Sequence, residues 1–204
     1  MAWELSSSYS IAIYFATFLA YFLKGLTGFG PALIIVPVIA VILGPKTALA
    51  TSAIIDVPVG ISLILFEKFE SSDFAVISKI VAIVIVGTVI GGLVVGWLDP
   101  GILETIIVAS VLFLGIKIII EAPQPTQDEI ELGKISSSGL LFAGGVCGSL
   151  TGMSGPFIVF ALKSRLSKSK FRRIVIAIFL IETIAKIFVY RGTGVWEEGV
   201  FWLS

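Results

Sequence analysis

The chain contains no histidine, and Cys147 is the one cysteine among its 204 residues. Without histidine it lacks the commonest general base and the commonest metal ligand. A single cysteine cannot form a disulfide within the chain, and the glycines around Cys147 favour a packing role for its small side chain. These absences argue against hydrolytic catalysis and metal chemistry, and no residue pattern indicates a cofactor.

Charged residues are also scarce. They make up 14% of the chain and sum to zero net charge, so no basic surface indicates binding to nucleic acid. Hydrophobic residues make up 57%, and the mean hydropathy is +1.08. A water-soluble globule of this size needs more polar surface than that. We therefore predict an all-α polytopic protein of the cytoplasmic membrane, surrounded by the lipid bilayer, and homo-oligomerisation stays open.

Two long apolar runs are each interrupted by glycines, a threonine and a proline. The first run, residues 9–43, is too long for one straight helix across a hydrocarbon core of about 30 Å. We predict that it breaks between Gly25 and Pro31 into two short pieces, either two short spans or a re-entrant hairpin. The second run, residues 139–162, repeats Leu-Thr-Gly and Gly-Pro at residues 150–156. Irregular backbone at such depth is tolerated where protein buries it or where it lines a wet cavity.

The remaining apolar segments predict spans over residues 46–66, 74–98, 102–120 and 171–190. Counting the crossings makes the two halves inverted repeats, each opening with a broken helix. We predict a first repeat over residues 1–120, a cytoplasmic linker over 121–138 and a partial second repeat over 139–204. Six cations between residues 163 and 173 place that loop in the cytoplasm, with binding of phosphate or lipid headgroups as the alternative. Small residues at Gly87, Gly91, Gly92 and Gly96 predict close helix packing.

Both breaks have the composition of an anion site. A helix that begins inside the membrane presents unpaired N–H groups and a partial positive charge at its N-terminus, and nearby hydroxyls and Lys24 supply further donors. The alternative is that the breaks are packing kinks and that Lys24 reaches the interface. The predicted substrate-binding residues are Lys24, Thr27, Gly28, Phe29, Gly30, Pro31, Thr151, Gly152, Ser154, Gly155 and Pro156.

Two carboxylates lie inside predicted spans, where ionisable residues are functional candidates by default. Asp56 and Glu182 are separated by the same number of residues as Lys46 and Arg172, so both pairs occupy corresponding positions in the two halves. Lys186 follows Glu182 by one helical turn, so the two either neutralise each other as an intrahelical pair or take part in proton coupling. Asp56 has no such partner in its own helix, which favours its protonation during transport. We predict Asp56, Glu182 and Lys186 as coupling residues.

With these motifs the chain resembles the TauE/SafE family of membrane transporters, described as sulfite or organosulfonate exporters. The resemblance is carried by residues 27–31 and 151–156, by the residues that open the next helices (48–52 and 176–179) and by residues 186–192. It implies export of small sulfur-containing oxyanions, coupled to an ion gradient. The glycine cluster at residues 28–30 is sparser than the family's, which leaves the substrate open. Family members continue through further helices, so we expect a fragment, a truncation or a subunit completed by another chain.

Other functions compete with this interpretation. Residues 152–155 match the Gly-x-Ser-Gly pattern of an intramembrane serine protease, but the chain has no histidine to activate the serine. Residues 25–30 have the spacing of a dinucleotide loop but no surrounding βαβ unit. A passive anion or small-solute channel and a non-transporting membrane assembly protein remain as alternatives to a transporter.

Overall fold

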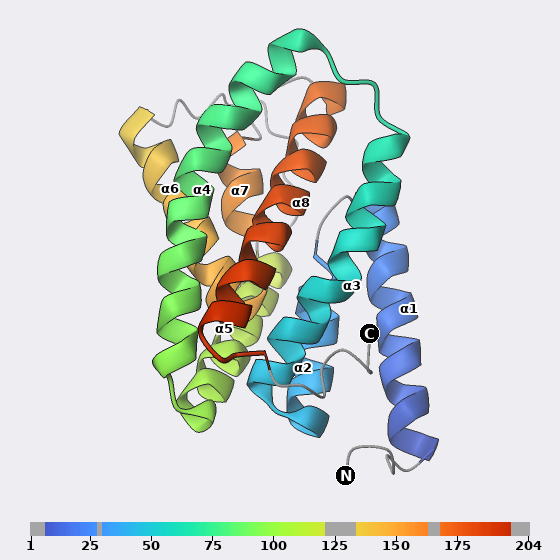
Figure 1. Cartoon of the computed structure of the whole chain (residues 1–204). Helices are drawn as coiled ribbons and strands as arrows, with labels where there is room; N and C mark the ends of the chain where they lie inside the picture. The colour runs from blue at the N-terminus through green and yellow to red at the C-terminus, as the bar shows by residue number, and fades with distance from the viewer. Residues whose placement is uncertain (1–6, 28–29, 121–133, 163–167, 197–204) are drawn as a thin grey trace.

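The computed structural model describes residues 7–27, 30–120, 134–162 and 168–196. Within these ranges the chain forms helices and no strand, which confirms the all-α prediction for this part of the protein (Figure 1). The eight helices of these ranges are α1 (Ser7–Thr27), α2 (Ala32–Leu43), α3 (Pro45–Leu65), α4 (Ser71–Trp97), α5 (Pro100–Ile120), α6 (Lys134–Thr151), α7 (Gly155–Leu162) and α8 (Lys168–Gly192).

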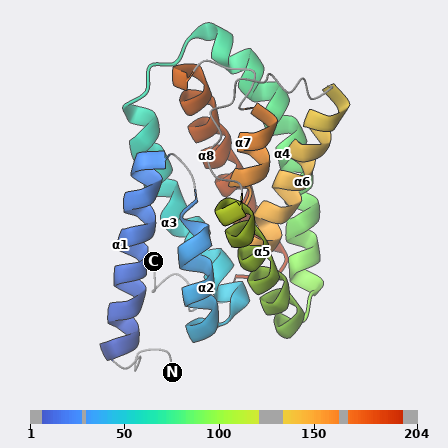
Figure 2. The same ribbon diagram turned by 180° about the vertical axis from the view of Figure 1, so that it is seen from behind.

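Two helical hairpins enter the molecule from opposite ends. Figures 1 and 2 show α1 and α2 turning near the middle after entering from one end, and α6 and α7 doing so from the other. The first hairpin differs from the two short pieces predicted. Its first helix continues through Gly25 and has 21 residues, about 31 Å of helix. A Cβ atom at Gly25 would have no neighbour within 4 Å outside its own stretch of helix, so close packing does not require the glycine here.

Helices α3 and α4 are long and apolar enough to cross a membrane, judged by length and composition within the described residues. Pro45 opens α3, where a missing N–H group costs nothing. Glu70 and Asp73 form a capping box at the start of α4. One apolar core joins α1, α2, α3 and α5 to Val95 of α4 and Tyr190 of α8, and a second joins α4, α6, α7 and α8.

The glycines of α4 are packing residues, as predicted. Gly87 and Gly91 lie so close to α6 that a Cβ atom would collide with backbone carbonyl oxygens of that helix. Gly92 lies equally close to the side chain of Val189 on α8, and Gly96 lies against the turn that follows α8. These contacts bring α6 and α8 onto the surface of α4 at distances that larger side chains would prevent.

A cluster of ion pairs joins the start of α8 to the start of α4. Arg173 contacts Glu70 at 2.8 Å and the buried carboxylate of Asp73 at 3.0 Å. Arg172 contacts Glu67 at 3.0 Å. Arg172 and Arg173 of the basic segment therefore have acidic partners, which lie about a hundred residues earlier in the chain. This end of the molecule is called the charged end below.

Candidate functional site

The two helix breaks meet at one cavity. The cavity lies between the start of α2, the break before α7, and the inner faces of α1, α3 and α8. Both predicted anion-binding helix starts therefore face the same space. Its lining residues are Lys24, Gly30, Pro31, Ala32, Leu33, Asp56, Gly152, Met153, Ser154, Gly155, Pro156, Phe179, Glu182, Thr183 and Lys186.

Each break turns on a glycine with a positive φ angle, a conformation that other residues seldom adopt. Gly30 has φ of 96° directly before Pro31, and Gly152 has φ of 78° after the end of α6. A Cβ atom on Gly152 would lie 2.9 Å from the Cβ atom of Ala32 at the start of α2. The two breaks thus touch each other, and no side chain caps the first turn of α2.

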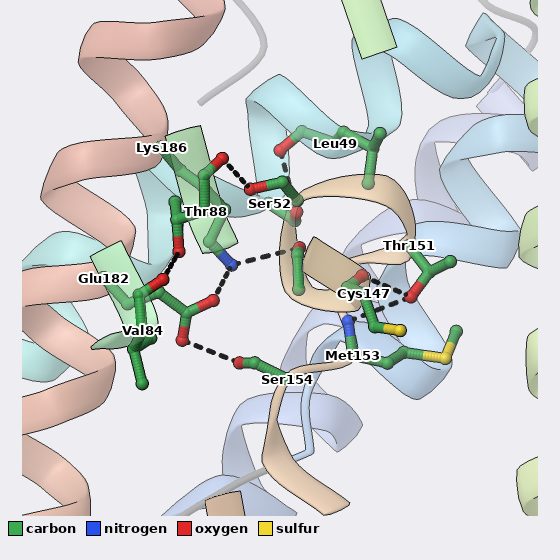
Figure 3. A network of polar contacts seen from close by, with 12 residues as sticks. Leu49, Ser52, Val84, Thr88, Cys147, Thr151, Met153, Ser154, Glu182 and Lys186 are labelled. Atoms are coloured by element: carbon green, nitrogen blue, oxygen red, sulfur yellow. Dashed lines mark hydrogen bonds and ion pairs between the residues drawn. The ribbon is translucent and has the colours of Figure 1, made fainter. Parts of the chain in front are cut away.

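Thr151 supports the second break from within. Its hydroxyl donates to the Cys147 carbonyl at 2.8 Å and accepts the N–H group of Met153 at 3.3 Å (Figure 3). The side chain is buried and is not among those that line the cavity. In this structure the Thr151 hydroxyl therefore binds the backbone of the break and does not face the cavity, where the sequence analysis predicted a substrate contact.

In the first half, Lys24 and Asp56 form an ion pair between α1 and α3. The ammonium nitrogen lies 2.5 Å from a carboxylate oxygen of Asp56. It also lies 5.5 Å from the centre of the Tyr21 ring, within the range of a cation–π contact. The sequence predicted Lys24 as an available countercharge and found no partner for Asp56 in its own helix. Each residue is in fact the partner of the other.

In the second half, Glu182 is almost completely enclosed, with 1% of its side chain exposed. One carboxylate oxygen lies 3.0 Å from the ammonium of Lys186, which confirms the predicted pair within α8. The other accepts the hydroxyl of Ser154 at 2.7 Å. Lys186 also donates to the carbonyl of Gly148 at 3.2 Å. Figure 3 shows the Glu182 carboxylate between Lys186 and Ser154.

The end of α6 is fixed to its neighbours by buried hydroxyl groups. Ser149 donates to the Thr88 carbonyl of α4 at 2.8 Å, and its own carbonyl accepts the Tyr190 hydroxyl of α8 at 2.5 Å. Gly148, one residue earlier, lies so close to Glu182 and Ser154 that a Cβ atom there would collide with the carboxylate. The second break therefore holds its polar groups in a fixed arrangement around Glu182.

A smaller cavity adjoins the first one. Lys24, Asp56, Phe179 and Thr183 line both cavities. The remaining lining residues of the smaller cavity lie on α3 and α8, and they extend to Leu63 near the end of α3 and to residue 176 near the start of α8. The smaller cavity thus leads from the Lys24–Asp56 pair toward the charged end.

Most of the predicted site residues come together at the central cavity. The lining includes both lysines, both carboxylates, Ser154, and the described glycines and prolines of the breaks. Gly28 and Phe29 lie outside the described residues, as does the side chain of Thr27. The sequence analysis missed Phe179 and Thr183 on α8. Phe179 lies three residues before Glu182 and Thr183 lies three residues before Lys186. This spacing places them on the same side of the helix, a signal that was present in the sequence.

Comparison with known proteins identifies a family. A family model described as Sulfite exporter TauE/SafE matches residues 13–203, which include both breaks and both ion pairs. No curated protein and no solved structure matches the chain.

Proposed function

We propose that this chain, which belongs to the TauE/SafE family of membrane transporters, binds a small oxyanion of the sulfite or sulfonate type in the cavity between its two breaks. The family is one of sulfite-exporter-type transporters, not of enzymes. Substrate, direction and coupling are our proposals: export across the cytoplasmic membrane, coupled to an ion gradient.

The convergence of donors at one cavity carries the proposal. The start of α2, the start of α7, the Ser154 hydroxyl and the ammonium groups of Lys24 and Lys186 all face the same space. Helix N-termini and ammonium groups favour anions, and a hydroxyl donates to an oxygen atom. A compact oxyanion has several acceptor oxygens within a few ångströms, so it can use donors that arrive from both breaks.

We further propose that the chain contains two inverted repeats. The two hairpins entering from opposite ends support this, because α3 follows the first and α8 follows the second, and these helices carry Asp56 and Glu182. Repeats of this kind place the binding site of many secondary transporters near the bilayer midplane. We assign residues 1–120 to the first repeat, 121–138 to a cytoplasmic linker and 139–204 to the second repeat.

The two carboxylates are proposed to couple transport to an ion gradient. Asp56 and Glu182 both line the cavity beside lysines, and Lys186 completes the set of coupling residues. Carboxylates so placed can bind and release a proton or attract a cation during transport. A channel that used the same donors would instead pass anions at a rate unaffected by the loss of either carboxylate.

Efflux of sulfite from proteoliposomes, with and without an imposed pH gradient, tests this function. We expect gradient-dependent efflux in the wild type and its loss in Lys24→Ala and Asp56→Asn. Lys79→Ala is the matched control, because Lys79 is exposed on α4 and does not line the cavity. If correctly inserted wild-type protein moves neither sulfite nor a small sulfonate, the proposed function is wrong.

A further inference from the structure

In the cavity, the Glu182 carboxylate already holds the donors that an oxyanion needs. It accepts a hydrogen bond from the Ser154 hydroxyl at 2.7 Å and forms an ion pair with the Lys186 ammonium at 3.0 Å. Both donors line the cavity, and both are buried. A carboxylate and a sulfonate present the same chemistry to these groups, a negative charge spread over oxygen atoms. Glu182 thus has the position and the contacts of a bound anion that is tethered to α8.

An incoming anion would meet this carboxylate at close range. Two negative charges a few ångströms apart repel strongly where little water screens them, and only 1% of the Glu182 side chain is exposed. The repulsion ends when Glu182 takes up a proton. A neutral carboxylic acid can then donate its O–H group to the Ser154 oxygen. The Ser154 hydroxyl hydrogen is thereby released, and Lys186 is left with an uncompensated positive charge.

We propose that Glu182 is an internal substitute for the transported anion, and that one proton from the same side must bind to its carboxylate before the anion can bind to Ser154 and Lys186. This inference rests on the proposed function and specifies its coupling as symport. Export by such symport runs down the concentration gradient of the anion or toward a more alkaline exterior. The charges balance, because one proton and one monovalent anion enter the cavity together, and both leave it when the anion is released. The loaded cavity then has the same net charge as the empty one.

The structure favours Glu182 over Asp56 for this role. Asp56 pairs with Lys24 across two helices and has 18% of its side chain exposed. Glu182 is paired within its own helix and also holds the hydroxyl at the break before α7. Water can reach Asp56 and stabilise its charge more readily than it can reach Glu182. An anion at the second break therefore competes directly with Glu182 for the Ser154 and Lys186 donors. Asp56 affects this anion only through longer-range repulsion.

Few other groups can titrate near Glu182 in the described part of the chain. Beside Glu182, the titratable side chains that line the cavity are Lys186 on α8, Lys24 on α1 and Asp56 on α3. Tyr190 follows Lys186 by one helical turn, Tyr21 lies beside Lys24, and Cys147 precedes the Gly148 that contacts Glu182. Helices α2 and α7 carry none. The two carboxylates are the groups to separate by mutation.

Methanesulfonate is the probe for the test, because it has three sulfonate oxygens and stays a monoanion over the pH range of the test, about pH 5 to about pH 8. Its binding to the purified full chain in detergent is measured by titration calorimetry in two buffers of different ionisation enthalpy. This comparison counts the protons taken up for each anion bound. In the wild type we expect close to one proton, and a dissociation constant that rises about tenfold per pH unit.

Glu182→Gln provides the decisive variant, because its amide resembles the protonated acid. We expect proton uptake to vanish and the dissociation constant to change by less than about twofold over the same pH range. Asp56→Asn tests the other carboxylate of the cavity. Its affinity for the anion can change, because Asp56 pairs with Lys24, but each anion bound should still bring one proton. Ser154→Ala should weaken binding about tenfold in the Glu182→Gln background and less in the wild type, where the carboxylate competes for the hydroxyl.

The outcomes separate the two proposals. Binding to the wild type without proton uptake overturns the role of Glu182 and leaves the oxyanion site intact. Persistent uptake in Glu182→Gln together with its loss in Asp56→Asn also overturns it and moves the coupling to the first half. Failure of the wild type to bind either methanesulfonate or sulfite at any pH overturns the proposed function and this inference together. The wild-type measurement needs no mutation, so it stands even where a variant does not fold.

Discussion

The two ion pairs of the cavity place a lysine beside a carboxylate in different ways. In the first half, Lys24 comes from α1 and Asp56 from α3. In the second half, Lys186 and Glu182 lie one turn apart on α8. A pair that joins two helices can separate when the helices move apart. A pair on one helix stays together, so its charge balance changes by protonation or by binding of another ion.

The residue one helical turn after each carboxylate explains why one pair joins two helices and the other lies within one. Gly60 stands four residues after Asp56, where the second half has Lys186 four residues after Glu182. A Cβ atom on Gly60 would lie 3.0 Å from the end of the Leu180 side chain on α8. Helix α8 thus occupies the space that a lysine on α3 would need. The cation of the first half comes from the broken helix instead.

Removing each lysine should show the largest difference in stability between the two ion pairs. We expect Lys186→Met to destabilise the protein by about 3–5 kcal/mol, because it leaves a buried carboxylate without its partner. Lys24→Met should cost less, since water reaches Asp56. Thermal unfolding in detergent measures both. Adding Glu182→Gln to Lys186→Met should recover much of the loss, and equal losses in the two single variants would contradict the contrast in burial.

Filling the space beside Glu182 is expected to have the next largest effect. In Gly148→Ala the new methyl group would collide with the Glu182 carboxylate and lie 2.7 Å from the Cβ atom of Ser154. We expect a loss of about 1–3 kcal/mol and of most sulfite efflux. Gly25→Ala is the control from the first half, because nothing lies within 4 Å of its new methyl group. Normal efflux in Gly148→Ala would show that the geometry around Glu182 is unimportant.

Chemical labelling compares the two carboxylates without mutation. A water-soluble carbodiimide should modify Asp56 several-fold faster than Glu182, because their side chains are 18% and 1% exposed. Mass spectrometry of the two peptides measures the rates, and exposed Glu104 provides a reference for full reactivity. Faster labelling of Glu182 would reverse the order of accessibility on which the assignment of the coupling group depends.

The smallest effect is expected at the crossing of α3 and α8. Gly60→Ala brings a methyl group to 3.0 Å from the end of Leu180, a flexible side chain that can turn away. We expect a cost of about 1 kcal/mol or less and nearly normal efflux. Unfolding of this variant beside Gly148→Ala measures the difference. A cost as large as that of Gly148→Ala would mean that α8 cannot adjust to α3 at this point.

Features local in sequence were predictable, and those that depend on distant contacts were not. Proline and glycine predicted both breaks, because these residues change the backbone conformations that are available at their own positions. Helical spacing identified the Glu182–Lys186 pair and the packing face of α4. The Lys24–Asp56 pair joins residues 32 positions apart on separate helices, so no periodic pattern reveals it. The length of α1 was also missed, because Gly25 was taken as the beginning of the break.

The role of Thr151 shows the same limit at a single residue. Its place in the repeated Leu-Thr-Gly motif indicated a hydroxyl that faces the ligand. In the structure this hydroxyl binds the backbone on both sides of the break. Sequence identifies a hydroxyl near a break, but its direction depends on which backbone groups the break leaves unpaired.

The most direct test of the account is methanesulfonate accumulation in proteoliposomes, driven by an imposed pH difference while the membrane potential is clamped at several values. Entry of one proton with one monovalent anion moves no net charge. We therefore predict accumulation on the alkaline side of about tenfold per pH unit, unchanged by the potential and lost in Glu182→Gln. Accumulation that follows the potential and ignores the pH difference would contradict the account.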